Sequence, residues 1–304
     1  MAFEQQNVNY AVQYAQALAN AYPYLSYFAD LWAGENASKY RPVNGKVIAV
    51  PSLEVSGAKA TNRNQITGTF NRNWNNEWQN LTMSMDREWD TLIDPMDIVE
   101  TNEVATIANI TQTFNEFQKV PEMDAYAASK LAAFADAANR VDDTDLTSAN
   151  ILAQWDSYLI SMTNNRVPRD RIVCKMTPNT YALLKEAAGI TRFVDVATGI
   201  RNVDRNVGKL DGVLIQEVPA DLMQTLYNFD EGWAPNGGEQ INLVMYDPAS
   251  LVAPVVYDVS MITAPNAGTK GKYVYYERYY YDVFQLAKRT AGIMANITDT
   301  VISL

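Results

Sequence analysis

The chain has 304 residues, of which 48% are hydrophobic and 19% charged, so it can bury a core as one elaborated domain or two intertwined ones. Its net charge of −11 argues against a protein whose main task is to grip nucleic acid, because affinity for phosphates comes from Lys and Arg. The absence of histidine excludes Ser-His-Asp and Cys-His nucleophile systems, HExxH zinc sites and any histidine general base.

Residues 1–42 predict an N-terminal arm. Small and apolar residues recur at helical spacing from Ala11 to Tyr22 until Pro23 ends the run, and an aromatic stretch follows at 24–32. Such short segments cannot bury themselves, so they need the body of the protein or a neighbouring copy. The N-terminus lacks a basic region followed by an apolar run, and no window approaches 18 apolar residues, so we expect a cytosolic product without a membrane partner.

Residues 43–95 predict a long β-hairpin. Residues 46–55 and 78–89 have the composition and alternation of strands, and the stretch 56–76 between them is rich in Gly and Asn without a core pattern. An apex of this length is unusual inside a compact domain, so we expect it to project.

The apex of this hairpin is basic. No Asp or Glu occurs from 55 to 76, while three basic residues give the stretch a charge of +3. One interpretation is a solvated loop, and the other is a clasp across the acidic surface of a second copy. The candidate contact residues are Lys59, Arg63, Ile66, Phe70, Arg72 and Trp74.

Helical spacing dominates the next segment. Asp97 and Glu100 have the form of a capping pair before a helical run to Phe114, and Val120-Pro121 is expected to break that run and start a second helix. The predicted core face of this second helix consists of Met123, Ala127, Leu131, Phe134 and Ala138. Its predicted solvent face consists of Glu122, Asp124, Lys130 and Asp136.

Helices and strands then alternate, as in a layered α/β subdomain. The acidic cluster at 142–145 is expected to complement the dipole of the following helix, with a cation site or a catalytic role as alternatives. Cys174 lies in a predicted buried strand, and residues 268–272 form a turn that lacks the spacing of a phosphate loop. Helices are predicted at 148–163 and 179–188, and strands at 172–176, 213–218, 241–246 and 254–262.

Six of the 18 tyrosines lie within nine residues near the C-terminus. Tyrosine offers rigid contact area with a hydroxyl that can stay in water, so this band predicts a surface that another copy covers. The alternative is an ordinary half-buried helix or strand. The candidate contact residues are Tyr273, Tyr275, Tyr276, Tyr279, Tyr280 and Tyr281.

The succession of arm, hairpin, helices, α/β segment and returning strand resembles the major capsid protein of tailed bacteriophages, the Hong Kong 97-type fold. The resemblance rests on the order and spacing of several phrases, which are VPEMDAYAASKLA at 120–132, VPRDRIVCKMTPNTYALL at 167–184, VGKLDGV at 207–213, and YYDVF at 280–284 continuing to Gly292 and Ile293. It implies an α+β protein with an N-terminal arm at 1–42, an extended β-hairpin loop at 43–95, a peripheral domain with a spine helix at 96–141 and 271–304, and an α/β axial domain at 142–270.

The same resemblance implies a structural role without catalytic, cofactor-binding or metal-binding residues. The expected partners are further copies in the hexamers and pentamers of an icosahedral shell, a portal, and double-stranded DNA enclosed without sequence-specific binding. The short arm before the hairpin favours a separate scaffolding protein, and the expected location is the virion after assembly in the host cytoplasm. Some relatives join a lysine of this loop to a neighbour's asparagine, which makes Lys59 a candidate by location. The alternatives are an encapsulin-type bacterial compartment, a tail-tube protein or adhesin, and a carboxylate- or lysine-dependent enzyme.

Overall fold

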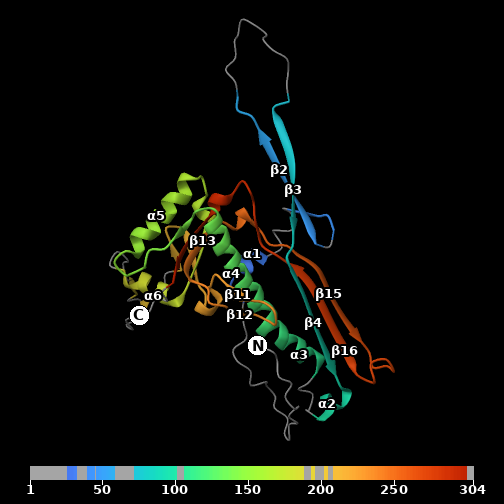
Figure 1. Ribbon diagram of the computed structural model, residues 1–304. Coiled ribbons are helices and arrows are strands. Elements are labelled where there is room, and N and C mark those ends of the chain that lie inside the picture. The colour runs from blue at the N-terminus through green and yellow to red at the C-terminus, as the bar shows by residue number, and fades with distance from the viewer. Residues whose placement is uncertain are drawn as a thin grey trace.

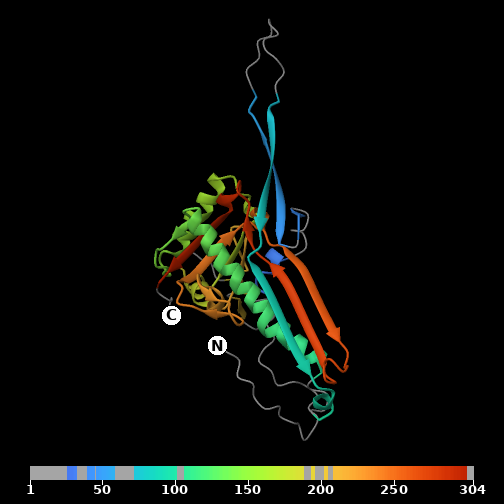
Figure 2. The same cartoon turned by 45° about the vertical axis from the view of Figure 1, so that its right-hand side comes forward.

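A computed structural model describes residues 26–32, 40–44, 46–58, 72–100, 106–187, 193–195, 202–204 and 208–299. Two thin extensions leave a compact body in opposite directions, and a long helix runs between the body and one of them (Figures 1 and 2). The described helices are α1 Ala29–Trp32, α2 Pro95–Glu100, α3 Ile107–Phe114, α4 Val120–Ala137, α5 Ile151–Asn164 and α6 Pro178–Glu186, and a π-helical turn occupies Asn115–Lys119.

The body is built on a six-stranded mixed sheet in the order β5-β18-β13-β6-β10-β9. Leu243 and Met245 point to the face covered by α5 and α6, while Val244 and Tyr246 point to the face covered by α4, as expected from the period of two in a strand. Helices on both faces bury the central strand β13 along its whole length. The six strands of this sheet, in its spatial order, are β5 Val141–Asp142, β18 Ile293–Thr298, β13 Gln240–Tyr246, β6 Val173–Met176, β10 Val213–Glu217 and β9 Lys209–Leu210.

The upper extension in Figure 1 is a two-stranded ribbon formed by β2 Val47–Val55 and β3 Trp74–Thr82. The short strand β1 Arg41–Pro42 pairs with the base of β2, where Ile48 and Val50 pack on residues of the body. The sequence predicted one second strand over 78–89, and this is wrong. The chain leaves β3 at Thr82 and starts a separate strand, β4 Met85–Ile93, in another sheet.

The lower extension is a three-stranded antiparallel sheet in the order β15-β16-β4 (Figure 2). Its other strands are β15 Val255–Thr263 and β16 Tyr273–Tyr281, so the sheet joins segments that the sequence assigned to the hairpin, the axial domain and the peripheral domain. Likewise β18 lies in the sheet of the predicted axial segment. Pairing between strands far apart in sequence leaves no local signal, so the sequence did not show these pairings. The domain boundaries themselves stay a prediction.

Three two-stranded pairs complete the described fold: β7 Phe193–Asp195 with β8 Asn202–Asp204, β11 Tyr227–Asn228 with β12 Ala234–Pro235, and β14 Leu251–Val252 with β17 Phe284–Gln285.

The long helix is continuous where the sequence predicted a break. Pro121 has no amide hydrogen to donate and its ring crowds the preceding turn, but the π-turn widens the helix there and the amide of Val120 bonds to the carbonyl of Asn115. The expected cap at Asp97 is also wrong. Asp97 lies within α2, and Thr106 caps α3 by accepting a hydrogen bond from the amide of Asn109.

The core face of α4 was predicted in part. Ala127 and Leu131 are fully buried, and Phe134 is half-buried against the same cluster. The solvent face is wrong at two positions, because Glu122 and Asp124 are buried. Glu122 forms an ion pair with Arg87, and Asp124 accepts hydrogen bonds from Ser26 and Tyr27; helical periodicity alone does not reveal such distant partners.

We expect Leu131→Ala to lower the free energy of unfolding by about 2–5 kcal/mol, because it leaves a cavity between α4 and the six-stranded sheet. Chemical denaturation followed by circular dichroism measures this. Asp136→Ala, an exposed position of the same helix, is the control and should change stability by no more than about 0.5 kcal/mol. Equal losses in the two variants would contradict this packing.

Candidate assembly surfaces

The tyrosine band predicted from the sequence forms β16, the middle strand of the three-stranded sheet. Because side chains alternate along a strand, Tyr275, Tyr279 and Tyr281 face the long helix and Tyr276 and Tyr280 face away from it. Four of these five tyrosines are buried and one of them fully, namely Tyr275, Tyr279, Tyr280 and the fully buried Tyr281. The band is therefore mostly internal.

Aromatic and charged groups of the same chain cover the helix side of this strand. Trp89 stacks on Phe114 with ring centroids 4.0 Å apart, and Tyr275 lies 5.5 Å from Trp89. The ammonium of Lys119 bonds to Glu277 and lies 4.2 Å from the ring centroid of Tyr279. Contacts that the sequence attributed to a second copy are thus intramolecular.

This burial corrects the expectation for Tyr275, Tyr279, Tyr280 and Tyr281, whose rings have little surface left for a neighbour. The expectation arose because local composition shows how much ring area must be covered but not what covers it. Tyr273 and Tyr276 are only half-buried, and for them contact with another copy stays a prediction.

A buried ion pair joins the sheet to the helix. Arg87 of β4 donates a hydrogen bond from Nη2 to Glu122 of α4 at 2.8 Å, and its Nε lies 2.8 Å from the other carboxylate oxygen. The hydroxyl of Tyr281 also donates to Glu122 at 2.8 Å. Burial raises the pKa of Glu122 by penalising its ionised form, and Arg87 opposes that rise. The geometry fixes which side of α4 faces the sheet.

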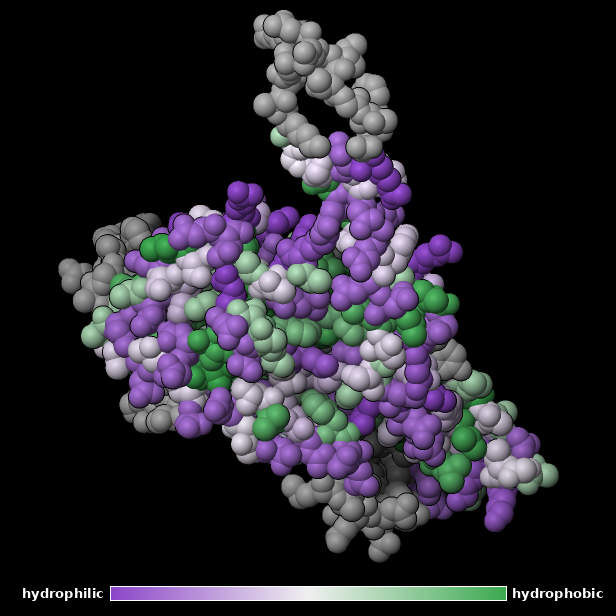
Figure 3. All heavy atoms as spheres, turned by 45° about the horizontal axis from the view of Figure 1, so that its top comes forward, coloured by the Kyte–Doolittle hydropathy of each residue, from purple (hydrophilic) through white to green (hydrophobic). Residues whose placement is uncertain are grey.

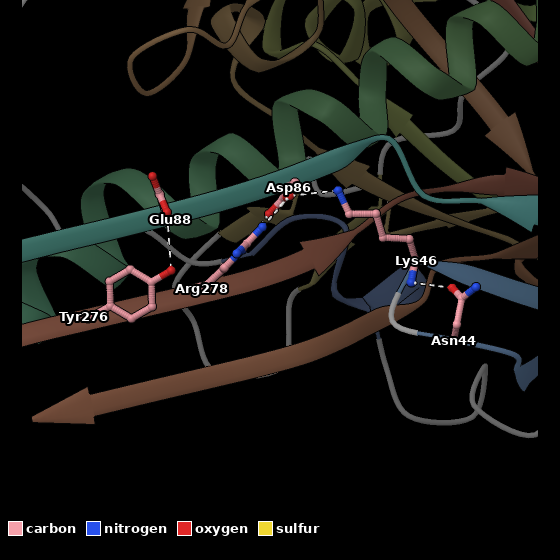
Figure 4. A network of polar contacts seen from close by, with 6 residues as sticks. All are labelled: Asn44, Lys46, Asp86, Glu88, Tyr276 and Arg278. Carbon is pink, nitrogen blue, oxygen red and sulfur yellow. Dashed lines mark hydrogen bonds and ion pairs between the residues drawn. The ribbon is translucent and has the colours of Figure 1, made fainter.

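A second polar network lies on the outer side of the sheet, where β2 of the hairpin begins (Figure 4). Asp86 of β4 accepts two hydrogen bonds from Arg278 of β16, at 3.0 and 2.8 Å, and one from Lys46 at 3.0 Å. The hydrogen bond from Arg278, with further help from Lys46, lowers the pKa of Asp86 from 3.8 to about 2. The network ties the base of the hairpin to the three-stranded sheet.

An inner contact fixes the chain between the hairpin and the sheet. Asp282 accepts hydrogen bonds from the amide of Ser84 at 2.8 Å and from its hydroxyl at 2.9 Å. The hydroxyl of Tyr126 donates to the other carboxylate oxygen of Asp282 at 2.7 Å. The base of the hairpin is thus anchored at both of its ends, through Lys46 before β2 and through Ser84 after β3.

One face of the projecting ribbon is apolar and exposed. The register places Val55 opposite Trp74 and Pro51 opposite Trp78, with Leu53 between them on the same face. The exposed fraction is 73% for Val55, 66% for Leu53 and about half for each tryptophan. Sequence reasoning selected only Trp74 from this stripe, although the alternation of Pro51, Leu53 and Val55 was a usable signal.

The described residues include only part of the predicted basic apex. The guanidinium of Arg72 lies 4.0 Å from the ring centroid of Trp74, and its Nε donates to the carbonyl of Trp74 at 3.0 Å. Lys59, Arg63, Ile66 and Phe70 lie outside the described residues, so their contacts stay predictions.

Within the described ranges, no three His, Cys, Asp or Glu side chains are grouped so that they could hold a metal ion. In the same ranges no helix is long and apolar enough to cross a membrane. Asp142 of the acidic cluster accepts hydrogen bonds from Tyr158 and Thr144, and α5 has no acidic residue in its first turn. The expected dipole role of that cluster is therefore wrong for Asp142.

Comparison with known proteins gave matches only at the level of structure. No family model matches the sequence, and no curated protein does. The capsid of the cyanophage P-SCSP1u superposes with a TM-score of 0.67 at 12% identity, covering 95% of this chain and 92% of that one. A chain from Mycobacterium phage Che8 gives 0.62 at 13% identity, covering 94% and 96%, and the capsid of Ralstonia phage GP4 gives 0.60 at 13%, covering 95% and 94%.

This chain has the Hong Kong 97-type capsid fold. The likeness extends over nearly the whole chain on both sides of each comparison, so it includes the extensions as well as the body. The α+β class and the capsid fold predicted from the order of elements are confirmed.

We expect the outer network of this capsid fold to give a measurable pH dependence. The folded-state pKa of Asp86 lies below its ordinary value, so Asp86 adds stability above about pH 4 and loses that contribution as the pH falls to about 2. Asp86→Asn should lower the thermal unfolding midpoint at pH 7 but match the original protein near pH 2. Solvent access limits the difference to about 1 kcal/mol or less.

Asp90→Asn is the control, because Asp90 lies exposed on the same strand and makes no ion pair with a described residue. Its effect should be smaller than that of Asp86→Asn at pH 7. A deficit of Asp86→Asn that is equally large at pH 7 and pH 2 would show that the carboxylate charge is not what holds the network.

Proposed function

We propose that this chain is the major capsid protein of a tailed bacteriophage and assembles, as hexamers and pentamers, into the icosahedral shell that encloses the genome. The observation that supports this most is the capsid fold over about 95% of the chain. Two of the three structures compared above are phage capsids and the third comes from a mycobacteriophage, and the extensions of this chain provide the surfaces that such an assembly needs.

The exposed ribbon supports an assembled state on physical grounds. A two-stranded hairpin is at best marginally stable in water, yet the outer half of this one is exposed along both strands, apart from an ion pair between Glu54 and Lys288 of the body. Its stripe of Leu53, Val55, Trp74 and Trp78 would gain about 25 cal/mol for each Å² that a neighbour covers. A second copy of the chain is the partner that a shell supplies.

The alternatives have less support. An enzyme based on carboxylates requires acidic groups free to react, but Glu122, Glu277 and Asp282 are held by Arg87, Lys119 and Ser84. A tail-tube protein or adhesin would not be expected to share this fold. An encapsulin-type compartment shares the shell architecture, and the contents of purified shells, genomic DNA or an enzyme cargo, distinguish it.

The remaining partners follow from the proposed function. The net charge of −11 supports DNA that is enclosed rather than gripped, since an acidic subunit offers few cations to replace the counterions of phosphates. A scaffolding protein and a portal would direct assembly in the host cytoplasm, and the mature chain would reside in the virion. The structural role needs no cofactor.

We expect the expressed chain, alone or with the products of neighbouring genes, to form closed shells of megadalton size. Size-exclusion chromatography and negative-stain electron microscopy test this. The isolated subunit should show no tight, salt-sensitive binding of free duplex DNA. A small fixed oligomer under every condition tested would contradict the proposal.

The basic apex provides a test of the predicted clasp. Arg63→Glu combined with Arg72→Glu should leave the subunit folded but impair assembly, with a defect that grows as salt is lowered because like charges then repel further. Each exposed ion pair contributes only about 0–1 kcal/mol, but the contact is repeated throughout a shell. Light scattering during assembly at several salt concentrations measures the effect.

Arg166→Glu combined with Lys209→Glu is the matched control, because both residues are exposed on the body and the change in net charge is the same. This control should assemble more nearly like the original chain. Equal assembly defects in the two double variants would show that total charge, and not the hairpin, is responsible.

A further inference from the structure

The strand β15 forms an open edge of the three-stranded sheet. It pairs only with β16 among the described strands, and no described helix or strand lies beside its other edge in Figures 1 and 2. An edge strand presents a row of amide and carbonyl groups that can pair with another strand. This edge is therefore a potential site for a further strand.

The outer half of β15 has none of the features that usually block such pairing. From Val259 to Thr263 it contains no charged residue and no proline, and its register with β16 is regular. Met261 and Ile262 are neighbours in the strand, so their side chains point to opposite faces of the sheet. Their exposed fractions are 55% and 58%, so both faces of the sheet are open here. Hydrophobic residues gather along this arm of the molecule at the lower right of Figure 3.

The opposite edge of the same sheet is different. On β4 the exposed residues Asp86, Glu88 and Asp90 place a carboxylate at every second position. Such charges discourage pairing with another edge. The contrast within one sheet singles out β15 as the unprotected edge.

The proposed shell supplies a second copy as the partner, and the charge of the chain limits where two copies can meet. Each copy carries −11, so two copies approach at least cost where no acidic groups face each other. When a strand pairs antiparallel with the same strand of a second copy about a two-fold axis, one residue must lie directly opposite its own counterpart at the axis. This follows because residues in an antiparallel ladder face each other in matched pairs. With the axis at Met261, all five uncharged residues from Val259 to Thr263 are paired, and no two like charges face each other.

We propose that β15 pairs antiparallel with β15 of a second copy about a two-fold axis at Met261, which joins two three-stranded sheets into one of six strands. Val259 then faces Thr263 of the second copy, Ser260 faces Ile262, and the two Met261 side chains face each other. The pairing rests on the proposed function in that it names one of the contacts between shell subunits.

Cysteine cross-linking tests this register. Cys174 is the only cysteine in the chain and is buried, so it contributes no background. Directly opposed Cβ atoms in an antiparallel pair are about 4.5–5.5 Å apart, which small adjustments bring within reach of a disulfide. Met261→Cys, oxidised both as the soluble chain at high concentration and in assembled particles, should run mostly as a dimer on a non-reducing gel.

Ile262→Cys is the matched control, since Ile262 is equally exposed but faces Ser260 of the second copy. Two copies of this cysteine would be offset by about 7 Å along the strands, so at least fivefold less dimer is expected. Met261→Lys places two like charges at the axis and should weaken self-association in sedimentation without lowering the thermal unfolding midpoint.

The outcomes separate this inference from the proposed function. Shells in which Met261→Cys forms no dimer would overturn the pairing and leave the shell function standing. Dimers without shells under any condition would support the pairing and count against the shell. Absence of dimers in both soluble chain and particles, or equal dimer from the two cysteine variants, would overturn the pairing.

Discussion

The ion pair between Arg87 and Glu122 is the interaction on which the arrangement of the two main sheets depends. Neither charge can be buried alone, because an unpaired ion in the interior costs several kcal/mol. The pair therefore fixes the rotation of α4 against the three-stranded sheet, while Leu131 and Ala135 of the same helix pack on the six-stranded sheet. A single rigid helix thereby sets the position of one sheet relative to the other.

A short N-terminal segment completes this core. Lys175 of β6 is buried and donates hydrogen bonds to the carbonyl of Tyr27, to Asp30 and to Gln216. Asp124 of α4 accepts from the amide of Tyr27 on the other side. Without residues 26–32 the core would contain a buried ammonium and a buried carboxylate that lack most of these partners, so the segment belongs to the body and is not a free arm.

The continuity of the long helix explains why the sheet edges are exposed. The π-turn accommodates Pro121, so α3 and α4 act as one rod of roughly 45 Å. The rod carries the three-stranded sheet beyond the body (Figure 1), where β15 pairs on one side only among the described strands. The capsid fold thus leaves its extensions with surface that the described part of the chain does not cover.

The sequence by itself determined many of the elements and their order. Alternation predicted the strand now seen as β15, and helical spacing predicted α5 and the buried positions Ala127 and Leu131, because these signals are local periodicities that burial of one face imposes. A strand and a helix were also predicted where β13 and α6 lie. The order of these elements was also sufficient for the capsid resemblance, although sequence identity to similar structures is only 12–13%.

Only the tertiary structure decided which surfaces are free. Local composition suited the tyrosine band to a second copy, but Trp89, Phe114 and Lys119 of the same chain cover its inner side. Glu122 was assigned to solvent by its spacing but is buried against Arg87, which lies 35 positions earlier. In both cases the partner is distant in sequence, and pairing between distant segments is a property of the fold that no local pattern encodes.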